Sequence, residues 1–129
     1  MADSAAEAEK KAKYEAAVKE ADALLGQSKW DESIAKYREA LTIDNGQTYP
    51  TQKITEIEKL KSDAAAKDQK KANYDAAISD GDNLFNQAKW DEAKAKYREA
   101  LALDGSQSYP TSKISEIDGI LAAAAEELK

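Results

Sequence analysis

The sequence repeats itself after sixty residues, and this duplication restricts the possible folds more than any other feature. Trp30 is matched by Trp90, and Tyr37 is matched by Tyr97. The tetrapeptide at 29–32 recurs at 89–92, and about half of all aligned positions are identical. Self-similarity at a fixed period indicates repeated supersecondary units, each of which buries its apolar face against neighbouring elements.

The duplication predicts two repeat units, the first at residues 1–69 and the second at residues 70–129. Residues 1–10 are interpreted as a fragment of a preceding unit, because residues 4–13 resemble the junction at 64–73. We therefore expect either a piece of a longer array or a sequence designed in the image of one.

Composition and periodicity favour an all-α chain. Only two prolines and five glycines interrupt the 129 residues. The abundant alanine, glutamate, lysine and leucine lose little side-chain entropy in a helix. No alternating run of β-branched residues reaches the length of a strand.

Each unit is expected to contain three helical stretches. In the first unit, helices are predicted at about 5–27 and 31–43 from apolar residues at three-and-four spacing. The tripeptide Asp44-Asn45-Gly46 should end the second helix, because asparagine and glycine tolerate a left-handed turn. Pro50 suits the first turn of a third helix.

The third helix is expected to run unbroken over 51–88 into the second unit, because no glycine or proline interrupts it before Gly81. Its middle part, at 61–73, has only alanine as an apolar residue. We predict a solvated helical spacer there, with a disordered linker as the alternative.

The segment at 27–44 resembles the turn and second helix of a tetratricopeptide repeat. Trp30 stands at the family's aromatic position, Ser33 at its small residue where helices cross, and Tyr37 and Ala40 follow at the family's spacing. The resemblance implies tandem helical hairpins. With the extra third helix of each unit and the long shared helix predicted above, we expect an α-solenoid-like arrangement. The third helix and spacer account for a period longer than the family's length of about 34 residues.

Recurrence at fixed spacing also predicts the structural core, with a ligand-facing role for the aromatic residues as the alternative. The expected core residues are Tyr14, Trp30, Tyr37, Tyr49, Ile54 and Ile57 in the first unit, and Tyr74, Trp90, Tyr97, Tyr109, Ile114 and Ile117 in the second. Buried tyrosine and tryptophan need a polar partner, and we expect the region of Asp31 and Glu32 to supply one. Lys94, which replaces Ile34, is expected to be more exposed than Ile34.

In tetratricopeptide proteins the first helix of each repeat lines a concave surface that binds peptides. The resemblance therefore implies a candidate peptide-binding face, formed by Val18, Asp22, Leu25, Ile78, Asp82 and Phe85. The lysine and asparagine residues with which some members clamp a terminal carboxylate are absent, so no such clamp is expected. This interpretation requires the apolar members of the face to be exposed and contiguous; otherwise they are part core and part solvated surface.

Several functional classes are not expected. The chain has no histidine, which is the usual general base and a common metal ligand. It also has no cysteine, so thiolate nucleophiles and thiolate metal ligands are absent. We expect no enzyme activity, no cofactor and no metal site. A net charge of −6 argues against nucleic-acid binding and against anionic lipid surfaces. No apolar run is long enough for membrane insertion and no signal segment is recognised, so we expect a soluble chain whose compartment the sequence does not identify.

The sequence thus predicts a non-catalytic structural or scaffolding module of helical repeats, of natural or consensus-designed origin. Its expected partners are neighbouring repeats in a longer array. The alternative is an interaction module of tetratricopeptide type that binds a protein or a peptide.

Overall fold

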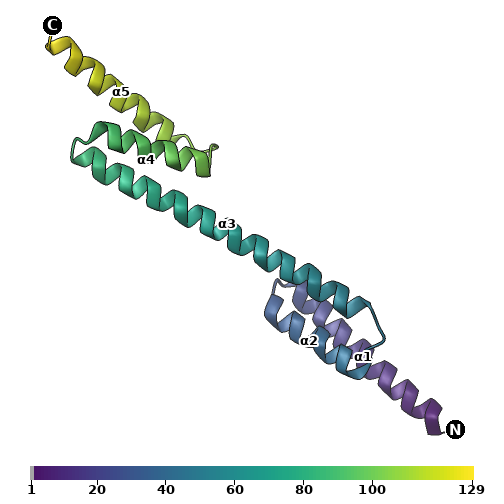
Figure 1. Cartoon of the computed structure of the whole chain (residues 1–129). Helices are drawn as coiled ribbons and strands as arrows, with labels where there is room; N and C mark the ends of the chain where they lie inside the picture. The colour runs from purple at the N-terminus through teal and green to yellow at the C-terminus, as the bar shows by residue number, and fades with distance from the viewer. Residues whose placement is uncertain (1) are drawn as a thin grey trace. The chain divides into compact units, whose positions relative to one another are not determined.

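The computed structural model describes residues 2–129, with side chains from residue 4 onwards, and this part of the chain is all helical (Figure 1). The helices, which contain 86% of the residues, are α1 (Ala2–Gly26), α2 (Trp30–Ile43), α3 (Tyr49–Asn86), α4 (Trp90–Leu103) and α5 (Tyr109–Glu127). No strand is found between residues 2 and 129. The prediction of an all-α chain is confirmed.

The chain forms two compact units, Met1–Ala64 and Ala65–Lys129. The first contains α1, α2 and the beginning of α3, and the second contains the rest of α3, α4 and α5. Helix α3 has 38 residues and includes the expected spacer. Residues 61–73 are helical and exposed, apart from a partly buried Ala64, so the alternative of a disordered linker is wrong.

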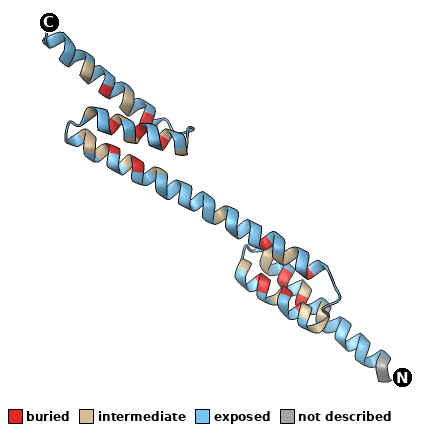
Figure 2. Cartoon of the chain, viewed as in Figure 1, coloured by how far each residue is buried: buried red, intermediate tan, exposed pale blue. Residues whose placement is uncertain are grey.

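The core of the first unit lies where its three helices meet, as the buried positions in Figure 2 show. Ala21 of α1, Ile34 and Tyr37 of α2, and Ile57 of α3 form this cluster. The partly buried residues packed against the cluster are Leu25, Trp30 and Ile54.

The second unit repeats this arrangement with different side chains. Ala93 and Tyr97 of α4 and Ile117 of α5 form its buried cluster. Around it pack the partly buried residues Ile78, Leu84, Phe85, Trp90, Ile114 and Leu121. Burial of so few large side chains in each unit means that contacts outside the apolar cluster contribute a substantial share of the stability.

Small residues allow the first two helices of each unit to cross closely. Ala21 is fully buried, and its carbonyl oxygen accepts a hydrogen bond of 2.8 Å from the Ser33 hydroxyl. At the matching position in the second unit, a Cβ atom on Gly81 would lie 2.7 Å from Cε1 of Tyr97. The Tyr97 ring therefore fills the space that a methyl group would need, and it depends on glycine at this position.

The predicted core is correct in part. Tyr37, Tyr97, Ile57 and Ile117 are fully buried. Partly buried are Tyr14, Trp30, Ile54, Tyr74, Trp90 and Ile114. Tyr49 and Tyr109 were predicted in the core, but they are 39% and 44% exposed. Each is the first residue of its helix, so part of its ring faces the turn and the solvent.

Lys94 is partly buried, whereas Ile34 retains only 6% exposure, as expected from the substitution. The Lys94 ammonium group forms an ion pair with Asp118 on α5. The long aliphatic stem of a lysine can pack against the core while its charged end reaches a partner at the surface.

The turn after the first helix of each unit contains a left-handed residue that is not glycine. Ser28 has φ of 59°, and Ala88 has φ of 60°. The Lys29 N–H donates to the Leu24 carbonyl, and the Ser28 N–H donates to the Leu25 carbonyl, each at 2.9 Å. This pair of bonds is a Schellman motif, in which the left-handed position usually belongs to glycine.

The turn after α2 ends the helix at the expected place but by another mechanism. Between residues 2 and 129 only Ser28 and Ala88 adopt positive φ, so the expected left-handed turn at Asn45 or Gly46 is not found. The Asp44 carboxylate instead accepts hydrogen bonds from the Gly46 N–H and the Gln47 side chain, both at 3.1 Å. This local side-chain bond turns the chain without a left-handed residue.

A search of residues 2–129 for a helix with the length and apolar character of a membrane span gives none.

We predict that Ala88→Gly stabilises the protein by about 0.5–1 kcal/mol, because glycine removes the steric cost of a left-handed Cβ. Ala76→Gly is the matched control, since Ala76 lies exposed inside α3. It should destabilise by about 1 kcal/mol, the helix-propensity difference between the two residues. Urea unfolding followed by circular dichroism measures both changes, and the same sign for both would contradict the assignment of the turn.

Candidate functional site

The most specific polar arrangement in each unit joins two tyrosines to one aspartate. In the first unit, Oδ1 of Asp22 on α1 accepts hydrogen bonds from the hydroxyl of Tyr37 on α2 and, at 2.9 Å, from that of Tyr49 on α3. A single carboxylate oxygen thus connects three helices. We refer to these three residues as the tyrosine–aspartate junction.

The second unit has the same junction at the matching positions. Oδ1 of Asp82 accepts hydrogen bonds from Tyr97 at 2.6 Å and from Tyr109 at 2.8 Å. The two rings meet edge to face, with centroids 6.2 Å apart and planes inclined by 77°. The rings of Tyr37 and Tyr49 show nearly the same geometry, at 6.1 Å and 75°. Hydrogen bonds to a charged acceptor contribute more than neutral ones, so the junction stabilises both units.

The expectation that the region of Asp31 and Glu32 would bind the buried tyrosine hydroxyls is wrong. Tyr37 points from α2 towards α1, so its hydroxyl meets Asp22 and not the start of its own helix. Asp31 instead pairs with Lys61 of α3. The spacing of Asp22 from Tyr37 is conserved between Asp82 and Tyr97, which is the signal in the sequence that identifies the pair.

The junction resists ionisation of its tyrosines. Burial, reinforced by the hydrogen bonds to Asp22 and Asp82, raises the pKa of Tyr37 and of Tyr97 far above the ordinary tyrosine value. For Tyr109 the hydrogen bond to Asp82 is the main cause, and with burial it raises the pKa to about 12. Each carboxylate therefore holds hydroxyls that stay protonated at neutral pH.

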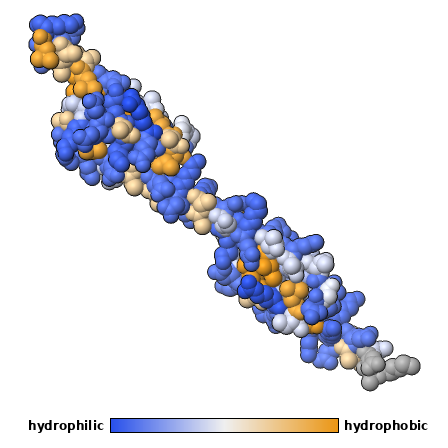
Figure 3. Space-filling view, viewed as in Figure 1, coloured by the Kyte–Doolittle hydropathy of each residue, from blue (hydrophilic) through white to orange (hydrophobic). Residues whose placement is uncertain are grey.

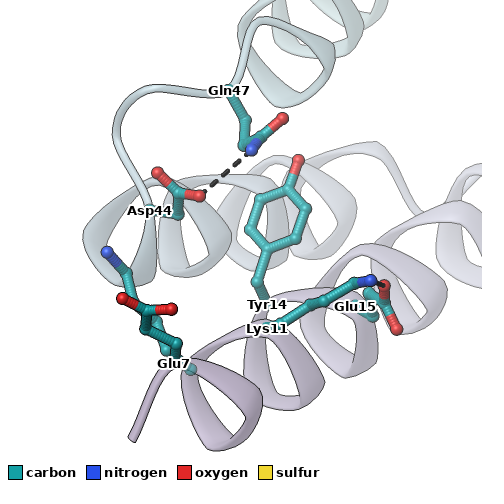
Figure 4. A pocket seen from close by; sticks show the side chains of 7 residues that line it. Glu7, Lys11, Tyr14, Glu15, Asp44 and Gln47 are labelled. Carbon is teal, nitrogen blue, oxygen red and sulfur yellow. Dashed lines mark hydrogen bonds and ion pairs between the residues drawn. The ribbon is translucent and has the colours of Figure 1, made fainter. Parts of the chain in front are cut away.

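A surface hollow of about 520 Å³ surrounds Tyr14 beside the turn after α2 (Figure 4). Tyr14 rises from α1 towards Gln47, and the Gln47 amide donates to Asp44 at 3.1 Å. Lys11 and Glu15 form a loose ion pair of 3.9 Å on α1. The other lining residues are Glu7 and Lys10.

The second unit has an equivalent hollow of about 500 Å³ around Tyr74. Its lining residues are Lys67, Asp68, Lys70, Lys71, Asp75, Asp104 and Gln107. Opposite charges are mixed in both hollows, and no partner for the Tyr14 or Tyr74 hydroxyl is found among residues 4–129. The hollows offer hydroxyl, amide and ammonium groups for polar contacts, but they do not pair a nucleophile with a base.

The structure places the six residues of the predicted peptide-binding face in three different roles. Asp22 and Asp82 belong to the junctions. Leu25, Ile78 and Phe85 pack against the cores of their own units. Val18 is partly buried on α1.

Phe85 is held particularly closely within its unit. Its ring meets the Trp90 ring edge to face, with centroids 5.1 Å apart, and the Lys113 ammonium lies 3.6 Å from its centroid. Leu25, Ile78 and Phe85, which are apolar residues of the predicted face, therefore pack within their own unit. A peptide-binding role for the six residues stays a prediction.

In each unit, the surface visible in Figure 3 is mostly hydrophilic, with hydrophobic residues in small groups. Within residues 4–129, no cluster of three or more carboxylates suitable for a metal ion occurs.

No family model matches the chain, and no curated protein matches it. Functional inference therefore depends on the geometry described above.

We predict that Tyr97→Phe destabilises the second unit by about 1.5–2 kcal/mol, because it removes a hydrogen bond to a charged acceptor. Tyr74→Phe is the matched control, because its hydroxyl has no partner in the described part of the chain, and it should change the stability by less than about 0.5 kcal/mol. Urea unfolding followed by Trp90 fluorescence in a Trp30→Phe background reports on this unit. Equal losses for both variants would show that the junction contributes nothing beyond packing.

We also predict alkaline destabilisation that begins near pH 10. Unfolded tyrosines lose their protons at about this pH, whereas Tyr109 in the folded chain does so only at about 12. Between these values the folded state binds more protons, so the free energy of unfolding falls as pH rises. Below this range the stabilisation is complete.

The urea midpoint should therefore decrease from pH 10 to 12, and Tyr109→Phe should flatten that decrease. The tyrosinate absorbance band checks the same point directly, because the junction tyrosines of the folded chain should contribute to it only above the ordinary tyrosine range. A band that develops fully in the folded protein near pH 10 would be incompatible with the junction.

Proposed function

We propose that this chain is a non-catalytic structural or scaffolding module, built from helical repeats similar to tetratricopeptide repeats with an added third helix. The resemblance of 27–44 to that family supports this assignment. So do the helical pairs α1–α2 and α3–α4, each of which is followed by a further helical segment in its own unit. A natural array and a consensus-designed sequence fit these observations equally well.

The observation that carries the proposal is the recurrence of the tyrosine–aspartate junction in both units. Side chains of this chemistry often perform catalysis or ligand binding, but here both hydroxyls are directed to a carboxylate of the same unit. The junction holds three helices together and engages both tyrosine hydroxyls within the unit. A module whose recurrent polar residues serve its own assembly fits a role in spacing and presenting other surfaces.

The general arrangement of charges agrees with a scaffold. Most ion pairs are exposed and join residues three or four positions apart on one helix, such as Lys59 with Asp63 at 2.9 Å and Lys71 with Asp75 at 3.1 Å. Such pairs contribute only a few tenths of a kcal/mol each, but they support a helix that has no apolar face to bury. The exposed middle of α3 is a segment of this kind.

A second candidate is a tetratricopeptide-type module that binds a protein or a peptide. The observation in its favour is the recurrence of the hollows around Tyr14 and Tyr74, with lysine, glutamine and aspartate at matching positions. Lining groups of both charges suit a polar peptide segment better than a small charged metabolite.

A duplication experiment tests the scaffold proposal. A second copy of residues 50–109, inserted between Tyr109 and Pro110, preserves the local sequence at both ends because residue 110 matches residue 50. A modular repeat protein should accept the extra unit, keep the oligomeric state of the original chain, keep its fractional helix content by circular dichroism and unfold at a urea concentration at least as high as before.

The control inserts residues 50–97 at the same place, which supplies an incomplete unit whose α4 is cut at Tyr97. This variant should lose helix content and aggregate or unfold at lower urea. If the complete and the incomplete insertions behave alike, the units are not independent modules and the scaffold proposal is wrong.

A further inference from the structure

The turn between α2 and α3 contains Asn45-Gly46, and no other asparagine in the chain precedes a glycine. Both residues are exposed. Asparagine is a thermolabile residue, and it reacts fastest where the next residue has no side chain to shield its backbone nitrogen. We propose that Asn45 is a site of spontaneous deamidation, with water as the only co-reactant.

The reaction balances without any enzyme or cofactor. The Gly46 backbone nitrogen gives up its proton to the solvent and attacks the side-chain carbonyl carbon of Asn45. The side-chain nitrogen takes up a proton from the solvent, its bond to that carbon breaks, ammonia leaves, and a cyclic succinimide remains. Water then opens the ring at either carbonyl, which gives aspartate or isoaspartate in place of asparagine.

The turn leaves the Asn45 side chain without a hydrogen bond to residues 4–129 but holds the attacking nitrogen in one. No hydrogen bond in the described part of the chain holds the Asn45 side chain. The Gly46 N–H, however, donates to Oδ1 of Asp44 at 3.1 Å, and this bond must break before the nitrogen can react. The reaction should therefore be slower than in a flexible peptide, although the exposed turn leaves it possible.

The other asparagines do not combine an exposed turn with a following glycine. Asn73, Asn83 and Asn86 all lie in α3, where the following backbone nitrogens are held in helical hydrogen bonds, such as that from Gln87 to the Asn83 carbonyl at 3.2 Å. The second unit has glycine and serine, Gly105-Ser106, where the first has Asn45-Gly46. The same turn thus exists in the chain without the reactive pair.

Deamidation would make the two units unequal. It places a new carboxylate next to Asp44, one of the groups that line the Tyr14 hollow. The isoaspartate product also lengthens the main chain in the turn that leads to Tyr49, whose hydroxyl completes the first junction. The first unit would change with age in both its surface charge and its stability, whereas the second would not.

The test uses the full chain, aged at physiological temperature and pH and analysed by peptide mass mapping. Residue 45 should acquire the small mass increase that distinguishes aspartate from asparagine, and labelling by an isoaspartyl methyltransferase should rise in the same peptide. A short peptide with the sequence of the turn serves as the chemical benchmark and should convert several times faster.

Gly46→Ala is the matched variant. A Cβ there meets only Oδ1 of Asp44 at 3.4 Å, and the residue does not need positive φ, so the fold should tolerate it. It should reduce the conversion several-fold without changing the helix content. Equal conversion in Gly46→Ala, or no conversion in the full chain while the peptide reacts completely, would overturn the proposal.

A second readout tests the effect on the first unit. In aged protein, Trp30 fluorescence in a Trp90→Phe background should show a lower urea midpoint, whereas Trp90 fluorescence in a Trp30→Phe background should not change. Equal decreases in both, or no decrease after complete conversion, would show that the modification does not distinguish the units.

Discussion

One carboxylate oxygen in each unit accepts hydrogen bonds from two helices other than its own, and the rest of the unit is arranged around it. The fully buried large side chains are few, mainly one tyrosine, one isoleucine and one proline in each unit. A core of that size leaves a narrow margin over the entropy of the ordered chain. The charged hydrogen bonds at Asp22 and Asp82 fix the direction of three helices at the edge of each core, where apolar packing alone is non-directional.

The residues of the polar junction are unchanged between the two units, whereas some residues around the apolar cluster have been exchanged. Leu25 is replaced by Phe85, and Lys61, which pairs with Asp31, is replaced by Leu121, which packs against the core. The residues of the junction are identical in both units. A core accepts exchanges in which the total volume is redistributed, whereas a hydroxyl and a carboxylate must lie within a few tenths of an ångström of a fixed separation.

The sequence alone predicts where the helices lie along the chain, but it does not predict which side chains contact one another between helices. Periodicity and breakers predicted five helices whose observed ends differ by a few residues, because those signals are local. The acceptor of the Tyr37 hydroxyl was assigned wrongly, since Asp22 lies on another helix and its direction depends on how α1 and α2 cross. The left-handed residues Ser28 and Ala88 were also missed, because neither residue type signals such a conformation and the two Schellman bonds impose it. Tyr49 recurs as regularly as Tyr37, but it is exposed because it begins a helix. Recurrence alone does not distinguish these two environments.

The turns that end α2 and α4 account for part of the recurrence of the two hollows, without any ligand. Asp44 and Gln47 line the first hollow, but both already form the turn that ends α2. Their counterparts Asp104 and Gln107 have the same hydrogen bond, at 3.2 Å. Among the lining positions outside the turn, one has changed sign, since Glu7 in one hollow corresponds to Lys67 in the other, while the lysines at 10 and 11 are kept as Lys70 and Lys71. A ligand that contacted this position in both hollows would meet opposite charges, so residues 7 and 67 do not belong to a shared binding site.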